Sequence, residues 1–298
     1  MTVLVTGASG LIGSHLVEAL LAHGHVVRTF QRGAPQRRDV EHVVGDVRVD
    51  THILCAAARG CRAIVHLAGR GDVGESRRDP VGYATLNATG ALHALEAARA
   101  AGARFVLASS QRVYPLTPRP CREDANLAPD SPYGYAKWVA ELWCRMASEH
   151  YGLTTTVLRF FSVYGPGQQS NGGSGVVSIF AKAALAGEPL VVQSDGRRDF
   201  THASDAARGI LLALERPADG QHRIYNLATG CGTTFEELAR AIVRLSGSCS
   251  ALESHVTESP GKDLVADITR ARQELGYEPG IDLHTGLSRY IEWLRRSA

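Results

Sequence analysis

The sequence predicts an α/β fold with a doubly wound parallel sheet and a smaller α+β lobe. In the first half of the chain, short apolar runs alternate with longer helical patterns, which is typical of consecutive β-α-β units. A glycine-rich loop joins the first apolar run to the first helical pattern, as in a Rossmann-type sheet. We therefore expect residues 1–165 to form this domain, with a return segment near 200–216, and residues 166–298 to form the second lobe.

Strands of the first half are expected where apolar residues run without polar alternation, because strands of a parallel sheet are buried on both faces. The expected strands cover residues 3–5, 26–30, 40–44, 63–67, 105–108 and 155–158. Longer patterns with helical spacing separate these runs. The expected helices cover residues 11–23, 81–101 and 133–150. Their connections should be right-handed crossovers, which place helices on both faces of the sheet.

The rhythm changes after about residue 165. Residues 168–175 are rich in glycine, serine and asparagine, which predicts a loop or lid. Beyond this segment we expect helices at 176–186, 204–214, 235–245 and 285–295, and strands near residue 190 and at 224–227. This half resembles a smaller α+β lobe, and we expect a cleft between it and the first domain.

Composition excludes several classes of protein. The 298 residues include 32 basic and 30 acidic side chains, a net charge of +2, so no basic field is present to hold nucleic acid or anionic lipid. The six cysteines are scattered without a C-x-x-C pair, which indicates reduced thiols and a cytoplasmic location. There is no signal-peptide pattern and no run of about 18 apolar residues, so we expect no membrane span. No metal site is expected.

The glycine-rich loop is the strongest local signal in the chain. Its glycines permit a tight turn and let backbone N–H groups approach a pyrophosphate, while the following helix N-terminus adds partial positive charge. A plain turn is the alternative, but the strand–loop–helix context favours a dinucleotide. The residues expected to bind it are Gly7, Gly10, Leu11, Ile12 and Gly13.

The end of the second expected strand bears on the choice between NAD and NADP. An acidic residue there usually accepts hydrogen bonds from the ribose of NAD, but this strand ends in Gln31 and Arg32. Arg32 could neutralise a 2′-phosphate, whereas a solvated arginine is the alternative. After the third expected strand come Asp46 and Val47; Asp46 could reach the adenine amine, or it could be a turn aspartate. We therefore expect NAD(P), with a tilt toward NADP.

Tyr133 and Lys137 are the central catalytic candidates. Residues four apart on a helix share one face, and these two lie at the start of an expected helix. A tyrosine pKa near 10 is too high for a base at neutral pH, and a nearby lysine ammonium lowers it. Since only three lysines occur, chance predicts about 0.09 Tyr-x-x-x-Lys pairs in this chain. A solvated surface pair is therefore the poorer interpretation.

Two serines, Ser109 and Ser110, end the fifth expected strand. Ligands of open α/β sheets bind beyond the carboxyl ends of the strands. A serine there can hydrogen-bond the reacting oxygen and relay its proton to Tyr133. We favour Ser110 for this role, and a serine that caps a turn is the alternative.

Together these residues resemble the extended short-chain dehydrogenases/reductases that modify nucleotide sugars, the NAD-dependent epimerase/dehydratase family. Further matches run in order along nearly the whole chain, at residues 66–69, 87, 158–166, 198–205, 225–230 and 266–277. The resemblance implies a Rossmann domain that binds NAD(P) and a second lobe that binds a nucleoside-diphosphate sugar. It also implies a homodimer formed through the helices at 81–101 and 133–150.

The resemblance adds residues to both binding sites. Besides Tyr133 and Lys137, the cofactor site would include Leu67, Ala68, Gly69, Asn87 and Phe160, with Phe160 packed on the nicotinamide. The substrate site would include Ser110, Tyr133, Ser162, Val176 and Arg198. Arg198 matches an arginine that grips the diphosphate, which suits a planar guanidinium; a salt bridge to Asp199 or Asp205 is the alternative.

Departures from the family pattern indicate which of the family's reactions this chain would catalyse. Dehydratases of this family carry an Asp-Glu pair directly after the catalytic hydroxyl residue, where this chain has Gln111 and Arg112. Elimination of water then lacks its acid and base, so a dehydratase is disfavoured. Residues 73–76 resemble the corresponding loop of 4-epimerases, whereas Gln31-Arg32 suits an NADPH-dependent 4-ketoreductase. The segment at 260–267 is shortened and lacks the family's usual second arginine.

The sequence therefore predicts an NAD(P)-dependent nucleoside-diphosphate-sugar epimerase that acts at C4. Tyr133 as phenolate would take the C4 hydroxyl proton beside Ser110, the nicotinamide would take and return a hydride, and the 4-keto sugar would rotate in between. An NADPH-dependent reductase of 4-keto sugars is the close alternative. A non-catalytic NADP-sensing protein is a distant one, against which the set of Ser110, Tyr133 and Lys137 argues.

Overall fold

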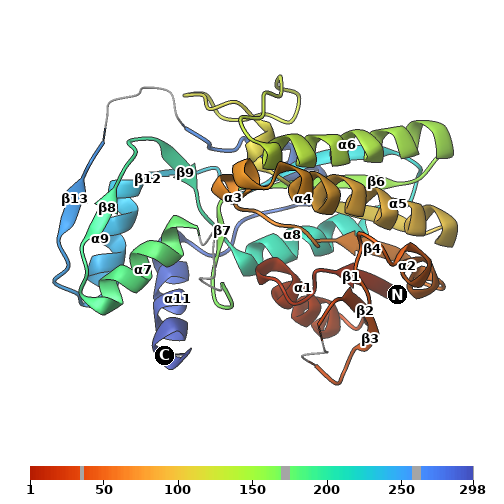
Figure 1. Cartoon of the computed structure of the whole chain (residues 1–298), viewed down its shortest axis with the longest axis horizontal. Coiled ribbons are helices and arrows are strands. Elements are labelled where there is room, and N and C mark those ends of the chain that lie inside the picture. The colour runs from red at the N-terminus through yellow and green to blue at the C-terminus, as the bar shows by residue number, and fades with distance from the viewer. Residues whose placement is uncertain (34–36, 169–174, 257–262, 298) are drawn as a thin grey trace.

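A seven-stranded parallel sheet is the centre of the fold; six of its strands come from residues 1–165 and one, His222–Leu227, from the second half of the chain (Figure 1). The computed structural model describes residues 1–33, 37–168, 175–256 and 263–297. From edge to edge the strands are β11 (His222–Leu227), β6 (Thr155–Phe160), β5 (Arg104–Ser110), β4 (Ala63–His66), β1 (Thr2–Thr6), β2 (Val26–Gln31) and β3 (Glu41–Val44). Each adjacent pair runs parallel. The predicted Rossmann-type sheet is confirmed.

Both faces of the sheet are covered, because alternate residues of each strand point to opposite sides and both sets are apolar. In β1, Val3 and Val5 belong to one core and Leu4 to the other. The helices over the first core are α1 (Leu11–Ala22), α8 (Ala203–Glu215) and α10 (Thr269–Leu275). Those over the second are α2 (Thr51–Ala58), α5 (Gly90–Ala101) and α6 (Pro132–Tyr151).

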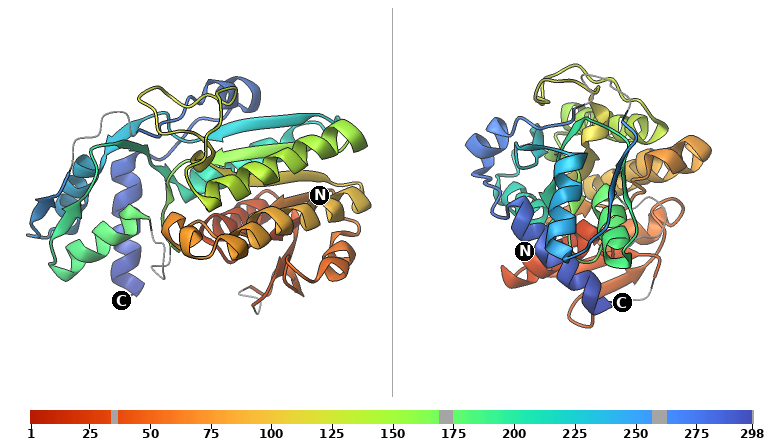
Figure 2. Two further views of the ribbon diagram at one scale, coloured as in Figure 1. Left: turned by 45° about the horizontal axis from the view of Figure 1, so that its top comes forward. Right: turned by 90° about the vertical axis from the view of Figure 1, so that its left-hand side faces the viewer.

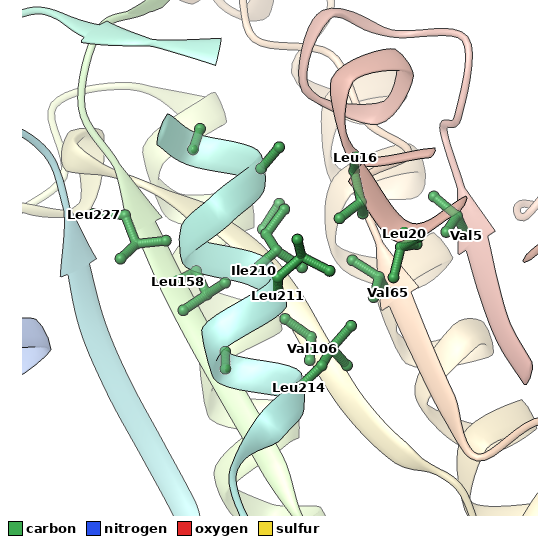
Figure 3. Packing of buried hydrophobic residues seen from close by; sticks show 14 of the residues in the cluster. Val5, Leu16, Leu20, Val65, Val106, Leu158, Ile210, Leu211, Leu214 and Leu227 are labelled. Atoms are coloured by element: carbon green, nitrogen blue, oxygen red, sulfur yellow. The ribbon is translucent and has the colours of Figure 1, made fainter. Parts of the chain in front are cut away.

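Figure 3 shows the core beneath α1 and α8. Leu16 and Leu20 of α1 and Ile210 of α8 pack with Val65 and Val106, which lie on neighbouring strands. None of these five side chains has more than 1% of its surface exposed. Burial of each such side chain is worth roughly 1.5–3 kcal/mol. These contacts fix the sheet and thereby the loops at its carboxyl edge.

The long helix expected at 81–101 is interrupted. α4 (Pro80–Ala84) and α5 are joined by a wide π-type turn, Thr85–Thr89. A wide turn inserts an extra residue into the helical repeat and so re-aims side chains, often at functional sites. Asn87 lies in this turn and has 1% of its surface exposed. Nothing in the alanine-rich sequence indicates the break, because every residue there is compatible with an α-helix.

The second lobe lies beside the sheet and has its own core (Figures 1 and 2). The helices α7 (Val176–Ala186), α9 (Phe235–Ser246) and α11 (Leu283–Ser297) pack with a parallel strand pair, β8 (Leu190–Val192) and β13 (Leu252–Ser254). Two further pairs lie toward the sheet: β9 (Arg197–Asp199) with β12 (Gly232–Thr234), and β7 (Val163–Tyr164) with β10 (Thr201–His202).

One expected strand lies in the other half of the fold. The sequence places residues 224–227 in the second lobe, but β11 is an edge strand of the central sheet. Its pairing with β6 begins at His222 opposite Thr155. Tyr225 and Leu227 are fully buried in the core under α1 and α8. An apolar pattern identifies a buried strand but not the sheet it joins, because the partner strand is distant in sequence.

Three short α-helices of the described residues are absent from the expected elements. They are α2, α3 (Val73–Arg78) and α10, and α3 lies at the segment expected to be a loop. Asp72 starts α3 by accepting a hydrogen bond from the backbone N–H of Glu75. Among the described residues, no helix combines the length and apolar character needed to cross a membrane.

Candidate active site

A cleft of about 770 Å³ lies at the carboxyl edge of the sheet and is flanked by the second lobe. One wall follows β1, β4, β5 and β6, where ligands of open α/β sheets bind. The other wall includes Phe200 and Phe235. The cleft brings together most of the predicted site residues: Gly7, Gly10, Leu11, Ile12, Gly13, Leu67, Gly69, Ser110, Tyr133, Lys137, Phe160, Ser162, Val176 and Arg198.

The glycine loop lies so close to other backbone that side chains would not fit. Gly7 has a φ of +70°, and a Cβ on it would lie 2.6 Å from the backbone nitrogen of Ala68. A Cβ on Gly13 would lie 2.2 Å from the carbonyl oxygen of Gly7. α1 begins directly after Gly10, and no side chain in the described part of the chain caps its first N–H groups. The loop thus offers backbone N–H groups to an anion.

The start of α6 is fixed by a cap. The Ser131 hydroxyl accepts a hydrogen bond from the backbone N–H of Gly134 at 3.3 Å, and Pro132 occupies the first turn. A Cβ on Gly134 would lie 2.4 Å from the carbonyl oxygen of Arg112. This close contact holds α6 against the segment that follows β5 and places Tyr133 in the cleft.

Ser110 and Tyr133 both line the cleft, and Ser110 is close enough to the phenol to lower its pKa. Burial raises the pKa of Tyr133, and the Ser110 side chain and the Arg112 charge partly offset that effect. The sequence predicts a pKa lowered by Lys137. The pKa in the structure moves the other way, because desolvation disfavours the phenolate and outweighs the favourable contacts.

Lys137 lies one turn after Tyr133 and has 6% of its surface exposed. Its Nζ donates a hydrogen bond to the carbonyl oxygen of Ala108 at 2.8 Å. Burial lowers the pKa of Lys137 to about 8, and the carboxylate of Glu141 opposes that shift. The charge on this lysine is therefore sensitive to nearby groups in the neutral to mildly alkaline range.

Glu141 and Arg159 form a buried ion pair behind Lys137. Arg159 Nε and Nη2 donate to the two carboxylate oxygens of Glu141 at 3.0 and 2.7 Å. The Ser109 hydroxyl donates to the same carboxylate. Glu141 and Arg159 have 4% and 2% of their surface exposed. The sequence interpretation misses both residues, although Glu141 follows Lys137 by four positions and so shares its helix face.

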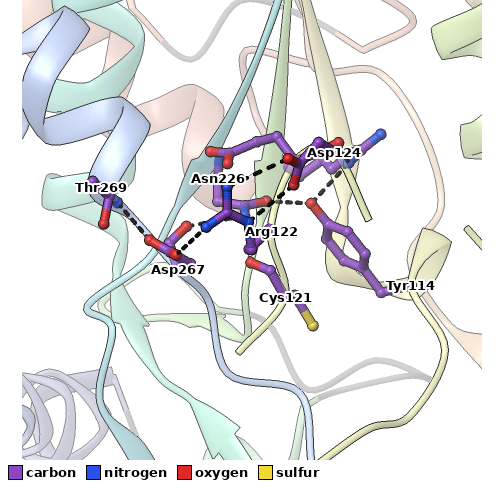
Figure 4. Close-up of polar contacts among 9 residues, drawn as sticks. Tyr114, Cys121, Arg122, Asp124, Asn226, Asp267 and Thr269 are labelled. Atoms are coloured by element: carbon purple, nitrogen blue, oxygen red, sulfur yellow. Dashed lines mark hydrogen bonds and ion pairs between the residues drawn. The ribbon is translucent and has the colours of Figure 1, made fainter. Parts of the chain in front are cut away.

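The pair continues into a polar network that joins distant segments (Figure 4). Arg159 Nη1 donates to the Tyr114 hydroxyl at 2.7 Å, and that hydroxyl donates to Asn226 Oδ1 at 2.8 Å. The amide of Asn226 donates to the carbonyl oxygens of Cys121 and Asp267 at 2.8 and 3.1 Å. These bonds tie β6 and β11 to the segments around Cys121 and Asp267.

Asn87 lies in the π-type turn, beside the cleft residue Gly69. Its Oδ1 accepts a hydrogen bond from the backbone N–H of Arg70 at 3.2 Å. Its buried Nδ2 has no hydrogen-bond partner among the described residues. A Cβ on Gly69 would lie 2.4 Å from Asn87 Oδ1 and 3.4 Å from Lys137 Nζ. Asn87, Gly69 and Lys137 are therefore neighbours, with one amide donor left to bind another group.

Ser162 adopts a backbone conformation with a φ of +24°, which is uncommon for a residue other than glycine. Its hydroxyl accepts a hydrogen bond from Gln111 Nε2 at 3.0 Å. Gln111 and Arg112 occupy the two positions directly after Ser110 and line the cleft. A neutral amide and a guanidinium therefore stand where elimination chemistry would need an acid and a base.

Arg198 lines the cleft from β9, and its guanidinium lies 5.2 Å from the ring centre of Phe235. Burial, followed by the charge of Arg112, lowers the pKa of Arg198 to about 10. The carboxylates considered as alternative partners have other contacts. Asp199 accepts hydrogen bonds from three backbone N–H groups and the Thr229 hydroxyl. Asp205 accepts two from backbone N–H groups and pairs with Arg208.

Five predicted cofactor residues are not among the described residues that line this cleft: Arg32, Asp46, Val47, Ala68 and Asn87. Arg32 is exposed at the end of β2. The Asp46 carboxylate pairs with Arg48 at 2.6 Å, which holds the pKa of Asp46 below its usual value. Val47 is buried. Their predicted contacts with the adenine end of a dinucleotide remain predictions.

Two expected segments fall partly outside the described residues. They are the loop or lid at 168–175, of which 169–174 are not described, and the shortened segment at 260–267, of which 260–262 are not described. Val176 begins α7 at the edge of the first segment and lines the cleft.

Comparison with known proteins gives one family. The sequence model of the NAD dependent epimerase/dehydratase family matches residues 3–228. This range spans the glycine loop, the Ser110–Tyr133–Lys137 set and the strand β11.

Individual relatives cover the whole chain. A UDP-glucose 4-epimerase of Mycolicibacterium smegmatis is 35% identical over 314 residues, which is 100% of both chains. The UDP-glucose 4-epimerase of Thermotoga maritima, solved with UDP-glucose, has a TM-score of 0.90 at 29% identity and covers 100% of this chain and 99% of its own. That of Thermus thermophilus, solved with NAD, has a TM-score of 0.89 at 30% identity over 100% of both chains.

Proposed function

Because the chain belongs to the NAD-dependent epimerase/dehydratase family, whose members are enzymes acting on nucleotide sugars, we propose that it interconverts the C4 epimers of a nucleoside-diphosphate sugar. One observation carries the proposal. Ser110 and Tyr133, with Lys137 buried one turn away, line the same cleft as the glycine loop. Reversible oxidation of an alcohol requires a group that accepts the hydroxyl proton and a dinucleotide that accepts the hydride from the same carbon. A tyrosine phenol beside a dinucleotide site meets both requirements.

The residues present fit a nicotinamide dinucleotide. The excluded Cβ positions at Gly7 and Gly13 leave room for a pyrophosphate at the start of α1. The unpartnered Nδ2 of Asn87 and the Nζ of Lys137 lie together and would hold the nicotinamide end, with Phe160 beside it. When bound, the dinucleotide supplies a reversible acceptor for the hydride at C4.

Tyr133 acts as the proton acceptor for the C4 hydroxyl, and Ser110 hydrogen-bonds the same oxygen. The phenol is protonated while buried, because desolvation raises its pKa. The positive charge of Arg112 lowers the pKa of the phenol and so opposes the effect of burial. The same groups return the proton when the sugar is reduced on its other face.

The substrate's phosphates are assigned to Arg198. This guanidinium lines the cleft on the side opposite the glycine loop, and its planar fork suits a diphosphate. Burial against Phe235 strengthens its interaction with an anion, since water competes less there. Ser162 and Val176 line the cleft between the two walls and would contact the sugar or nucleotide.

A reductase that consumes NADPH is the second candidate. It is favoured by the exposed Arg32 at the end of β2, where a carboxylate that would repel a 2′-phosphate is missing. Titration of NAD and NADP with the wild-type protein and Arg32→Gln measures this role. If Arg32 binds the 2′-phosphate, the substitution weakens NADP by roughly ten-fold or more relative to NAD; an unchanged ratio makes Arg32 a solvated residue.

A homodimer through α5 and α6 accompanies the proposal. Tyr135 and Leu142 of α6 have 52% and 47% of their surface exposed, and these side chains would pack against a second copy of the chain. Light scattering during gel filtration measures the mass against the 31.9 kDa of one chain.

Substitution of Tyr133 tests the proposed chemistry. Tyr133→Phe removes the proton acceptor and should lower kcat for epimerisation by at least about 10²-fold, with binding of NAD retained. Tyr135→Phe is the matched control, because Tyr135 lies on the same helix but has an exposed side chain. Equal activity of the two variants would show that Tyr133 is not the proton acceptor.

A further inference from the structure

We infer that the sugar end of the cleft carries a carboxylate subsite built on Arg112, so that the preferred substrate is a nucleoside-diphosphate hexuronate rather than a neutral hexose. This inference rests on the proposed function, which leaves the sugar open. It commits to the chemical class of the group attached to C5 of the sugar.

Arg112 is placed next to the reaction centre by its backbone. It lies in a short turn, Gln111–Val113, directly after β5, and its N–H donates to the Ser110 hydroxyl oxygen at 3.2 Å. Its carbonyl oxygen lies against Gly134 at the start of α6. The turn is therefore anchored to both elements that carry the proposed catalytic hydroxyls.

The Arg112 side chain faces the cleft and is four-fifths buried, with 20% of its surface exposed. Its charge acts on Tyr133, whose pKa it lowers, and on Arg198, whose pKa it also lowers. Arg112 is thus close both to the reaction centre and to the residue assigned to the diphosphate, and it lines the cleft in which the proposed substrate would bind.

The charge of Arg112 is incompletely compensated by protein groups. Its nearest carboxylate, Asp130, lies 3.5 Å from Nη2, beyond a good hydrogen bond, and has 41% of its side chain exposed. The buried Nε of Arg112 has no hydrogen-bond partner among the described residues. The guanidinium of Arg112 therefore carries a positive charge that the described protein groups neutralise only in part.

The acidic residues of the cleft do not supply the missing partner. Asp72 accepts the N–H of Glu75 at the start of α3. Glu75 accepts the Tyr83 hydroxyl at 2.8 Å and lies 3.6 Å from Arg70. Both carboxylates are thus engaged in the segment after β4.

The position of Arg112 suits a carboxylate on the sugar. With the C4 oxygen at Ser110 and Tyr133, the C6 group is attached to the adjacent ring carbon and lies within reach of the following turn. A C6 carboxylate would accept two parallel hydrogen bonds from the guanidinium. A neutral hydroxymethyl group would leave the buried cation without an opposite charge, which is unfavourable.

Specificity measurements with two substrates test the inference. Steady-state kinetics and calorimetric binding in the presence of NAD are compared for UDP-glucuronate and UDP-glucose, which differ only at C6. For wild-type protein we expect the ratio of kcat/KM, and the ratio of affinities, to favour UDP-glucuronate. Arg112→Gln should reduce both ratios on the order of 10²-fold; any effect common to both sugars cancels in them.

Arg77→Gln is the matched control. It removes a cation that contacts Asp130 through the backbone carbonyl at 3.4 Å, but Arg77 is not among the described residues lining the cleft. Its ratios should equal those of the wild type. Equal or tighter binding of UDP-glucose by the wild-type protein would overturn the inference. An Arg112→Gln loss shared equally by both sugars would also overturn it and assign Arg112 to the diphosphate.

Failure of the proposed function is a separate outcome. If the protein epimerises neither these two sugars nor any other nucleoside-diphosphate hexose, the proposed function fails, while the ratio of affinities still decides the carboxylate subsite. If it epimerises UDP-glucose with the higher kcat/KM, the proposed function stands and the subsite fails.

Discussion

At the scale of single residues, the charge on Lys137 depends on a carboxylate one helical turn away. Glu141 is fixed by Arg159 and Ser109 in a site that excludes water. Its negative charge opposes the desolvation that lowers the pKa of Lys137. Glu141 does not line the cleft among the described residues, so it acts as a positioning residue rather than on the substrate.

Substitution of Glu141 should shift the pH profile. Lysine is charged below its pKa, which is about 8 for Lys137. Glu141→Gln removes the opposing carboxylate and lowers that pKa further, so the alkaline limb of kcat/KM should move to lower pH. The same variant leaves Arg159 buried without its partner, which should cost about 3–5 kcal/mol in the free energy of unfolding.

Two variants separate this effect from a loss of stability. Glu141→Asp keeps the charge and should retain the wild-type alkaline limb. Glu149→Gln removes an exposed carboxylate that pairs with Arg145 on the same helix and should change neither the limb nor the stability. An unchanged limb in a folded Glu141→Gln protein would contradict the role given to this residue.

At the scale of elements, the glycine loop differs from an ordinary turn by what surrounds it. Gly7 and Gly24 both have positive φ, +70° and +72°. A Cβ on Gly24 would meet nothing within 4 Å, whereas one on Gly7 would collide with the backbone of Ala68. The close approach of the backbone after β1 to that after β4 at this point forms the proposed dinucleotide cradle.

The two glycines make a matched pair of variants. Substitution of either glycine by alanine places a Cβ on a left-handed backbone, which lowers the free energy of unfolding by about 1 kcal/mol. Gly7→Ala must also displace backbone, so it should lower the affinity for NAD by at least ten-fold and the melting temperature by more than Gly24→Ala does. Calorimetric titration with NAD measures the affinity. Equal affinities of the two variants would show that the collision is relieved without disturbing the cradle.

Strands, helices and catalytic candidates can be predicted from the sequence for the same reason, because each depends on a pattern of residues close together in the chain. The pair of Tyr133 and Lys137 can be predicted because residues four apart lie about one helical turn apart and lysine is scarce in this chain. The π-type turn at Asn87 is not readable, because it depends on packing rather than on residue type.

Contacts between distant segments of the chain cannot be predicted from the sequence either. Arg159 and Glu141 are 18 positions apart, and Tyr114 and Asn226 are 112 positions apart. Only the fold brings such residues together. For the same reason, the sequence predicts a strand at residues 224–227 but places it in the second lobe, whereas the structure has it in the central sheet.

At the scale of the whole molecule, buried histidines link stability to pH. His66 and His202 have 1% and 2% of their surface exposed, and burial lowers their pKa values to about 3 and about 4 from 6.5. In the unfolded chain both titrate near 6.5. Their contribution to stability is therefore complete above pH 6.5 and is lost as the pH falls toward the folded-state values.

Replacement of His66 isolates this contribution. His66→Asn keeps a polar group near Thr6, the hydrogen-bond partner of the ring at 2.9 Å, but does not titrate. Between about pH 7.5 and 5, the free energy of unfolding of the wild type should fall by about 2 kcal/mol more than that of the variant. Denaturant unfolding at the two pH values measures the difference. Parallel losses in the two proteins would show that His66 titrates normally in the fold.

The whole molecule is proposed to oxidise and reduce the same carbon within one turnover, and one experiment tests that directly. UDP-hexoses and UDP-hexuronates are incubated with the protein and a catalytic amount of NAD, while proton NMR follows the C4 epimers and near-ultraviolet absorbance follows reduced cofactor. We expect at least one pair of epimers to reach the same ratio from either side without accumulation or loss of NAD(P)H. Conversion of a 4-keto sugar in one direction, with stoichiometric oxidation of NADPH, would contradict an epimerase and identify a reductase.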